Sequence, residues 1–252
     1  MEILGLDIGG SGIKAALVDT EQGILLSERY RVDTPQPSAP WVVADAVYNI
    51  VEHFNWKGPV GCGFPAPMQH GVARNAANID PAWINTNVEA LFRERINAEV
   101  SVVNDADAAG VAEMHFGAGH NRKGLIMLLT IGTGIGSALI IDGKLVPNTE
   151  LGHLRFKGGI AEHYASDSAR RKEDLSWKEW GRRFNEYLWH VHQLFYPDLI
   201  ILGGGISRKL DKFMELIDVP VSVVPAEFRN EAGIVGAAVC ARDHVLARLI
   251  ED

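Results

Sequence analysis

The sequence predicts an α/β protein with two lobes around a central cleft, and two observations lead to this prediction. Apolar strand patterns alternate with helical patterns along the 252 residues. One pattern also occurs twice, as ILGLDIGGSGIKAALVD at residues 3–19 and IMLLTIGTGIGSALIID at residues 126–142. Each copy reads as an apolar strand, a glycine-rich turn and a second apolar strand. Two copies suggest two homologous half-domains that face one cleft.

The two copies align at a constant offset of 123 residues (130 − 7 = 123). The aligned pairs are Asp7 with Thr130, Gly9 with Gly132, Ala15 with Ala138 and Asp19 with Asp142. No helix follows the glycines, so neither a dinucleotide fingerprint nor a Walker loop applies. A coincidence between two Gly-rich hairpins is the alternative explanation.

Periodicity places the remaining elements. Helices are expected at residues 40–54, 88–96, 106–116, 176–195 and 232–250, and buried strands at 60–65, 100–103 and 199–202. Ser176 and Glu179 have the spacing of a capping box for the fourth helix. We expect a small lobe at residues 1–108, completed by the C-terminal helix at 231–252, and a large lobe at 109–230.

Composition limits the function classes. The net charge of −8 disfavours general nucleic-acid binding, although it does not exclude a local basic groove. The two cysteines, Cys62 and Cys240, cannot build a disulfide framework, so a reducing, cytoplasmic compartment is expected. The N-terminus lacks the features of a signal peptide, and no apolar run reaches the roughly 20 residues of a membrane helix.

Five motifs together resemble the ROK family of sugar kinases and repressors. They are DIGGSGIK (residues 7–14), VNDA (103–106), TIGTGIG (130–136), ELGH (150–153) and LGGG (202–205). The resemblance covers essentially the whole chain and implies the actin-like ATPase (ribonuclease H-like) superfold, shared with hexokinase and Hsp70. The short length and the segment RRKEDLSWKEW (170–180) are most similar to the polyphosphate glucokinases of that family. Residues 155–162 contain no Cys where many members carry a zinc loop, so no structural zinc is expected.

For the acceptor side, the resemblance implies that Asp105 is the general base that takes a proton from a sugar hydroxyl. Local sequence alone favours another role, the N-cap of the helix at 106–116, and the two roles are compatible. Asp107 is the weaker candidate for the base, because it lies on a different helix face.

The resemblance also implies a sugar-binding set that surrounds this base. Its members are Gly63, Pro65, Asn78, Asn104, Asp105, Glu150, His153 and Glu162. Fixed carboxylate, amide and imidazole groups suit a sugar, because each hydroxyl both donates and accepts hydrogen bonds. The alternative for each residue is an ordinary solvated loop position.

For the donor side, the two glycine turns are expected to grip phosphate through backbone N–H groups. The first turn contributes Asp7, Gly9, Gly10, Ser11, Gly12 and Lys14, the second contributes Thr130, Gly132, Thr133 and Gly134, and the third glycine run contributes Gly204 and Gly205. Asp7 is expected to hold Mg²⁺, through water, since Mg²⁺ prefers few carboxylates plus substrate oxygens. Alternatively, both turns are tight hairpins only, Lys14 points to solvent, and the third run is a helix entry capped by Ser207.

Residues 167–183 carry six basic and four acidic side chains, which reverses the overall charge. Arg170, Arg171 and Lys172 are therefore expected to bind a polyanionic donor, because Arg suits phosphate. The alternative is a solvated helix face with i,i+4 pairs such as Glu179 with Arg183. The aromatic residues Trp177, Trp180, Tyr187 and Trp189 are interpreted as packing residues, either inside the lobe or at a dimer interface.

The expected function is phosphoryl transfer from inorganic polyphosphate, and from ATP, to the 6-hydroxyl of glucose or a related hexose such as mannose. Mg²⁺ is the expected cofactor and a homodimer the expected assembly, with no nucleic acid and no membrane partner. The alternative functions are a strictly ATP-dependent ROK kinase for fructose or an N-acetylated amino sugar, a ROK repressor, and an actin-like filament or chaperone ATPase. A repressor needs a helix-turn-helix before Asp7, where this sequence has only six residues.

Overall fold

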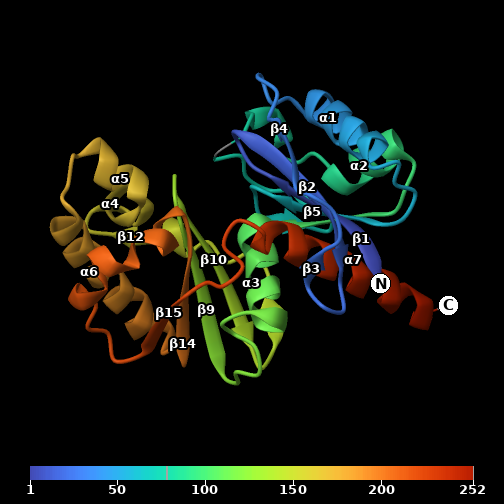
Figure 1. The fold of residues 1–252 in the computed structure, drawn as a ribbon. Helices are drawn as coiled ribbons and strands as arrows, with labels where there is room; N and C mark the ends of the chain where they lie inside the picture. The colour runs from blue at the N-terminus through green and yellow to red at the C-terminus, as the bar shows by residue number, and fades with distance from the viewer. Residues whose placement is uncertain (78, 252) are drawn as a thin grey trace. The chain divides into compact units, whose positions relative to one another are not determined.

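The computed structural model describes residues 1–77 and 79–251. The chain divides into two compact units (Figure 1). Unit 1 consists of Met1–Ala112 and Glu231–Asp252, and unit 2 consists of Glu113–Asn230. Among the described residues, no helix combines the length and the apolar content needed to cross a membrane.

Unit 1 is built on one mixed sheet with the strand order β3-β2-β1-β5-β8, in which β4 also pairs with β2. Its strands are β1 (Glu2–Ile8), β2 (Gly12–Asp19), β3 (Ile24–Leu25), β4 (Tyr30–Asp33), β5 (Val60–Phe64) and β8 (Val100–Asn104). Its helices are α1 (Pro40–His53), η1 (Pro81–Trp83), α2 (Val88–Ile96), the start of α3 (Asp105–Phe116) and α7 (Ala232–Glu251). A separate two-stranded hairpin is formed by β6 (Met68–Gln69) and β7 (Val72–Ala73). β1 and β2 form an antiparallel hairpin, while β5 runs parallel to β1 and β8 runs parallel to β5.

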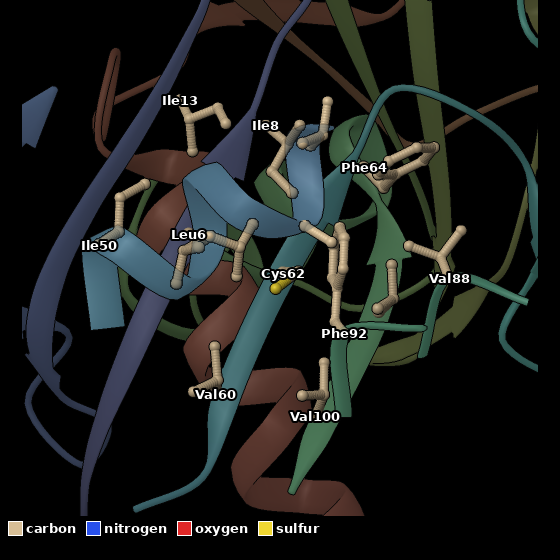
Figure 2. Packing of buried hydrophobic residues seen from close by; sticks show 14 of the residues in the cluster. Leu6, Ile8, Ile13, Ile50, Val60, Cys62, Phe64, Val88, Phe92 and Val100 are labelled. Atoms are coloured by element: carbon tan, nitrogen blue, oxygen red, sulfur yellow. The ribbon is translucent and has the colours of Figure 1, made fainter. Parts of the chain in front are cut away.

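Alternation along β1 sends its side chains to two different layers. Leu4, Leu6 and Ile8 enter an apolar cluster with residues of α1, α2 and β5, which Figure 2 shows from close by. The opposite face packs against α7, and there glycine is required: a Cβ at Gly61 would collide with the backbone carbonyl of Ala237. The helix can approach β5 this closely only because the strand lacks a side chain at that point.

Unit 2 repeats this plan with the strand order β11-β10-β9-β14-β15. The strands are β9 (Leu125–Ile131), β10 (Ile135–Ile141), β11 (Lys144–Val146), β14 (Leu199–Gly204) and β15 (Ser222–Pro225). The other elements are η2 (Leu151–His153), β12 (Arg155–Phe156), β13 (Gly159–Ile160), α4 (Glu162–Ala165), α5 (Asp167–Lys172), α6 (Trp177–Phe195), η3 (Gly205–Lys212) and η4 (Met214–Leu216). The amphipathic helix α6 covers one face of the sheet and buries Trp180, Phe184 and Leu188 there. It begins at the predicted capping box of Ser176 and Glu179.

The two hairpins confirm the predicted repeat but not its constant offset. In β1–β2 the residue Ile8 pairs with Ile13, and in β9–β10 the residue Ile131 pairs with Ile135. The offset is therefore 123 before the turn (131 − 8) and 122 after it (135 − 13). The alignments of Ala15 with Ala138 and of Asp19 with Asp142 were wrong by one position, because the second turn is one residue shorter than the first.

Candidate active site

The candidate residues of unit 1 meet at the carboxyl ends of its parallel strands. Asp7 of β1 pairs in register with Gly63 of β5, and Gly63 pairs with Val103 of β8. Asn104 and Asp105 follow directly where β8 ends and α3 begins. A Cβ at Gly63 would lie 3.6 Å from the Cα of Asp105, an ordinary van der Waals distance, so the two residues are close neighbours. Parallel pairing thus assembles one polar edge from three distant segments.

Asn104, rather than Asp105, caps helix α3. The Oδ1 atom of Asn104 accepts the backbone N–H groups of Ala106 at 2.9 Å and Asp107 at 3.1 Å. Asp105 is the first residue of the helix, half-buried, and its Oδ1 accepts the N–H of Ala106 at 2.8 Å. The local prediction that Asp105 is the N-cap was therefore wrong, because the residue before it already fills that position.

Asp7 and Lys14 form an ion pair across the β1–β2 hairpin, with 2.8 Å between Lys14 Nζ and Asp7 Oδ2. Both side chains are partly buried, on the sheet face that packs against α7. A Cβ at Gly233, in the first turn of α7, would lie 2.9 Å from the Asp7 carboxyl carbon. Lys14 is therefore fixed beside the first glycine turn, and the alternative in which it points to solvent does not hold.

The first glycine turn, residues 9–12, is anchored by its carbonyl groups. The Thr34 hydroxyl donates to the carbonyl of Gly9, the Gln36 amide donates to that of Gly10 at 3.3 Å, and Arg31 donates to that of Ser11 at 3.3 Å. These three side chains come from β4 and the loop after it, which sequence reasoning did not single out. No local motif predicts that all three side chains donate hydrogen bonds to the carbonyl groups of the turn.

In unit 2, His153 lies between two carboxylates. Its Nδ1 is 3.4 Å from Glu150 Oε2, and its Nε2 is 3.7 Å from Glu162 Oε1. Burial raises the pKa of Glu150 above its usual range; His153 acts to lower it and Glu162 to raise it. The structure thus brings together three predicted sugar-binding residues from η2, the loop before it and α4, within a partly exposed polar cluster.

This cluster is locked to the second glycine turn, residues 132–134. The Oε2 atom of Glu162 accepts the backbone N–H of Ile135 at 3.1 Å. A Cβ at Gly134 would collide with the Glu162 carboxylate, so a side chain there would require that carboxylate to move. A Cβ at Gly152, inside the ELGH motif, would likewise collide with the carbonyl of Ile135. The conformation of the turn and the position of the carboxylates are therefore coupled.

Ser137 of β10 is a supporting residue that sequence reasoning missed. Its buried hydroxyl donates to the carbonyl of Thr149 at 2.7 Å and accepts the N–H of Leu151 at 3.0 Å. These bonds flank Glu150 on both sides and hold its backbone against the strand. A polar residue in an otherwise apolar strand pattern was the signal that could have identified it.

The second and third glycine runs lie side by side, because β14 is parallel to β9. Gly204 pairs in register with Ile131, and its φ of 77° leads into η3. The Ser207 hydroxyl donates to the carbonyl of Gly204 at 2.9 Å. The second turn is tied to α5 by a bond of 3.1 Å from Ser168 N–H to the Gly132 carbonyl. The second turn therefore lies next to the Gly204 loop and is bonded to the start of α5.

The basic segment is partly neutralised. Asp167 Oδ1 lies 2.8 Å from Arg170 Nε, and its Oδ2 lies 3.3 Å from Arg171 Nε. Arg183 pairs with Glu173 at 2.8 Å, so the predicted pair of Arg183 with Glu179 was wrong in its partner. Glu179 instead completes the capping box with Ser176.

The aromatic residues of α6 are packing residues of unit 2. Trp180 and Tyr187 are fully buried, and Trp189 donates to Asp218 at 2.6 Å. Burial raises the pKa of Tyr187, and the nearby charge of Glu162 raises it further, so this phenol stays neutral. Of the remaining predicted positions, Pro65 is half-buried after β5, and Asn78 lies outside the described residues.

The residues at the first turn fit the expected Mg²⁺ ion. Asp7 offers a single carboxylate, 19% exposed, two residues before Gly9 of the first glycine turn. In the described part of the chain, no group of three or more His, Cys, Asp or Glu side chains could hold a metal ion by itself. An ion at this place would need phosphate oxygens and water as its other ligands, which is the coordination that Mg²⁺ prefers.

Comparison with known proteins decides the family. Residues 3–165 match the ROK family over more than half of the chain. The chain belongs to the ROK family. It is 47% identical over 236 residues to a polyphosphate glucokinase of Mycobacterium tuberculosis (strain CDC 1551 / Oshkosh), which covers 93% of this chain and 89% of that protein. The resemblance inferred from the motifs is thereby confirmed.

Solved structures agree with this ROK assignment. An inorganic polyphosphate/ATP-glucomannokinase from Arthrobacter sp. strain KM matches with a TM-score of 0.93 and 48% identity, over 96% of this chain and 99% of that one. A ROK family glucokinase from Streptomyces griseus, in complex with glucose and AMPPNP, matches with a TM-score of 0.82 and 27% identity, over 96% and 100%. The predicted actin-like ATPase fold is confirmed.

Proposed function

We propose that this ROK protein is a polyphosphate/ATP-dependent glucokinase, which transfers a phosphoryl group to the 6-hydroxyl of glucose or mannose. The observation that supports this most strongly is the near-full-length identity of 47% to a polyphosphate glucokinase. The similarity to a polyphosphate/ATP-glucomannokinase supports both donors and both sugars.

In this proposal Asp105 takes the proton of the attacking sugar hydroxyl. A carboxylate within hydrogen-bond reach of the hydroxyl removes the proton as the new P–O bond forms. One feature supports the role: Asn104, and not Asp105, provides the N-cap of α3. The proton ends on the Asp105 carboxylate, and the leaving phosphate carries the displaced electron pair.

The proposed sugar-binding residues of unit 1 are Gly63, Pro65, Asn78, Asn104 and Asp105. Those of unit 2 are Glu150, His153 and Glu162. Ionised carboxylates accept from neighbouring sugar hydroxyls, and His153, held between Glu150 and Glu162, orients both. Because the cluster is partly buried, each bond to a sugar hydroxyl forms in an environment that excludes much of the competing water.

The proposed donor-binding residues of unit 1 are Asp7 and those of the first glycine turn. Those of unit 2 are the second glycine turn, the loop at Gly204 and Gly205, and the basic residues Arg170, Arg171 and Lys172. The residues of the turns are Gly9, Gly10, Ser11, Gly12, Lys14, Thr130, Gly132, Thr133 and Gly134. Lys14 supplies positive charge at the first turn, and Asp7 orients it. Mg²⁺, held near Asp7 through water, would neutralise charge on the transferred phosphoryl group.

A donor and sugar panel tests the proposal. We expect glucose 6-phosphate from glucose with long-chain polyphosphate and with ATP, detected by a coupled dehydrogenase, and a lower rate with mannose. Turnover with ATP alone would contradict the polyphosphate assignment. Turnover of fructose or an N-acetylated amino sugar in preference to glucose would contradict the sugar assignment.

We also propose that the enzyme is a cytoplasmic homodimer. Cys62 and Cys240 are free thiols, which suits a reducing compartment. Leu194 and Tyr196, at the C-terminal end of α6, are 54% and 71% exposed and offer apolar contact area. Light scattering at micromolar concentration should give twice the chain mass of 27.6 kDa; a single-chain mass would refute the dimer.

A further inference from the structure

A second basic segment lies beside the first, and the sequence motifs did not reveal it. Helix η3 carries Arg208, Lys209 and Lys212, all exposed, immediately after the third glycine run. Among residues 1–77 and 79–251, no carboxylate forms an ion pair with any of these three cations. Asp211 is the one acidic residue within η3, so the helix keeps a net positive charge.

Trp177 joins this segment to α5. The guanidinium carbon of Arg170 lies 4.2 Å from the centre of its indole, and the ammonium of Lys212 lies 5.7 Å from the same ring. Phe213, the residue after η3, stacks on Trp177 at 6.1 Å with an interplanar angle of 13°. Two cations that are 42 residues apart in sequence (212 − 170) are therefore held at one aromatic side chain.

This arrangement concentrates charge without cancelling it. A carboxylate partner neutralises a cation, whereas an aromatic ring attracts the cation through its quadrupole and leaves the net charge in place. Asp167 partly neutralises Arg170 and Arg171, but Lys209 and Lys212 have no such partner in the described part of the chain. Placing like charges together costs free energy, which a bound polyanion would recover.

Both basic segments begin at the donor loops. Ser168, in the first turn of α5, bonds to the Gly132 carbonyl, and η3 starts at Gly205. Gly204 is paired with Ile131, next to the second turn. A chain of phosphates gripped at these loops would meet the cations of η3 and α5 as soon as it extends beyond them.

We propose that Arg208, Lys209 and Lys212 form a track for the phosphates of inorganic polyphosphate that lie beyond the reacting one. The proposal rests on the proposed function, since it extends the donor site of that enzyme. Each further phosphate adds a negative charge, whereas ATP ends in a nucleoside and short polyphosphates do not reach the track. The track therefore sets chain-length preference rather than chemistry.

The test removes two charges from η3. In the double variant Lys209→Gln/Lys212→Gln, we expect the KM per chain for long polyphosphate to rise about five- to tenfold, since exposed charge contacts are individually weak. The KM for ATP and for tripolyphosphate should change less than twofold, and kcat should be unchanged. The slope of log KM against log salt concentration for long polyphosphate should also become shallower.

The matched control is Lys123→Gln/Lys144→Gln, which removes the same charge from exposed lysines of unit 2 at the other end of the β9–β10 hairpin. It should leave all three KM values unchanged. Lys209→Arg/Lys212→Arg should keep the wild-type KM for long polyphosphate, which separates charge from folding.

The outcomes separate the track from the function. Wild-type enzyme that uses ATP but no polyphosphate overturns the proposed donor and the track together. Wild-type enzyme that uses long polyphosphate, with an unchanged KM in the Gln double variant, overturns the track alone. An equal loss with ATP and with polyphosphate also overturns it, because the lysines would then act on the shared donor loops.

Discussion

The two glycine hairpins share the same strand–turn–strand arrangement but carry different side chains at equivalent positions. In unit 1 the penultimate residue of the strand before the turn is Asp7, which is paired with Lys14 across the hairpin. In unit 2 the equivalent residue is Thr130, and its cross-strand partner is Gly136. One turn therefore carries a charged pair, and the other carries none at that place.

The turns also differ in what fixes them. The first is held from outside through its carbonyls by Thr34, Gln36 and Arg31. The second is shorter by one residue and is fixed by Glu162, which belongs to the proposed sugar-binding set. Unit 1 therefore carries an ion pair at its turn, whereas the turn of unit 2 is coupled to a carboxylate of the proposed sugar-binding set.

The largest effect should come from the base in unit 1. In Asp105→Asn, kcat should fall about 10³-fold, because general-base catalysis contributes roughly 10²–10⁴-fold. The unfolding free energy should change by about 1 kcal/mol or less, since the cap is Asn104. Steady-state kinetics, with glucose binding by calorimetry, checks both. A variant that turns over glucose at the wild-type rate would show that the base lies elsewhere.

The next largest effect on activity should come from a substitution in the Asp7–Lys14 ion pair at the first turn. In Asp7→Asn, activity and apparent Mg²⁺ affinity should each fall about 10–100-fold, the range for a carboxylate that acts on a metal through water. The comparison variant Thr130→Val, at the equivalent position of unit 2, should alter donor KM but leave the Mg²⁺ dependence intact. An equal change in Mg²⁺ dependence for the two variants would remove the distinction between the hairpins.

Coupling in unit 2 can be tested with two glycines of one turn. In Gly134→Ala the new methyl group displaces the Glu162 carboxylate, which loses its hydrogen bond from the Ile135 N–H. We therefore expect destabilisation of about 1 kcal/mol and a glucose KM raised about tenfold. In Gly132→Ala no atom lies within 4 Å of the added methyl, so stability should change by less than about 0.5 kcal/mol. Denaturant unfolding and sugar titration measure the difference. Equal stability of the two variants would contradict the coupling.

The smallest effect concerns pH. Burial raises the pKa of Glu150 in the folded state, so the folded protein binds more protons than the unfolded chain above the ordinary carboxyl pKa. Stability from this group is therefore greatest at low pH and is lost as the pH rises through the folded-state pKa. Glu150→Gln should flatten this decline and should be relatively more stable near neutral pH. A steeper decline in the variant would mean that the His153 charge outweighs burial.

Local pattern was enough for much of the fold. The helix at residues 88–96 has the predicted bounds, and α6 begins at the predicted capping box. The repeat, with its strand, turn and strand, was visible because hairpin residues alternate and glycine marks the turn. The one-residue difference in turn length could not be predicted from the sequence. Both second strands are mostly apolar, so they align almost equally well at an offset of 123 or of 122.

The candidate site was less accessible to sequence reasoning. The motifs indicated Glu150, His153 and Glu162, but not the Ser137 hydroxyl that holds the backbone around Glu150. Similarly, the sequence indicates one basic segment at residues 167–183. In the structure a second basic segment, η3, lies beside it, because Arg170 and Lys212 both contact Trp177. Contacts between elements far apart in sequence leave no local pattern.

By itself, the sequence determined the family, the duplicated hairpin and the identity of the chemical groups, because these depend on residue type and short spacing. Only the tertiary structure decided that Lys14 pairs with Asp7, that Asn104 is the cap, and that Lys212 and Arg170 share one indole. The physical reason is that partner choice among charged side chains depends on register and on packing across the sheet. Those quantities are fixed only when the whole chain folds.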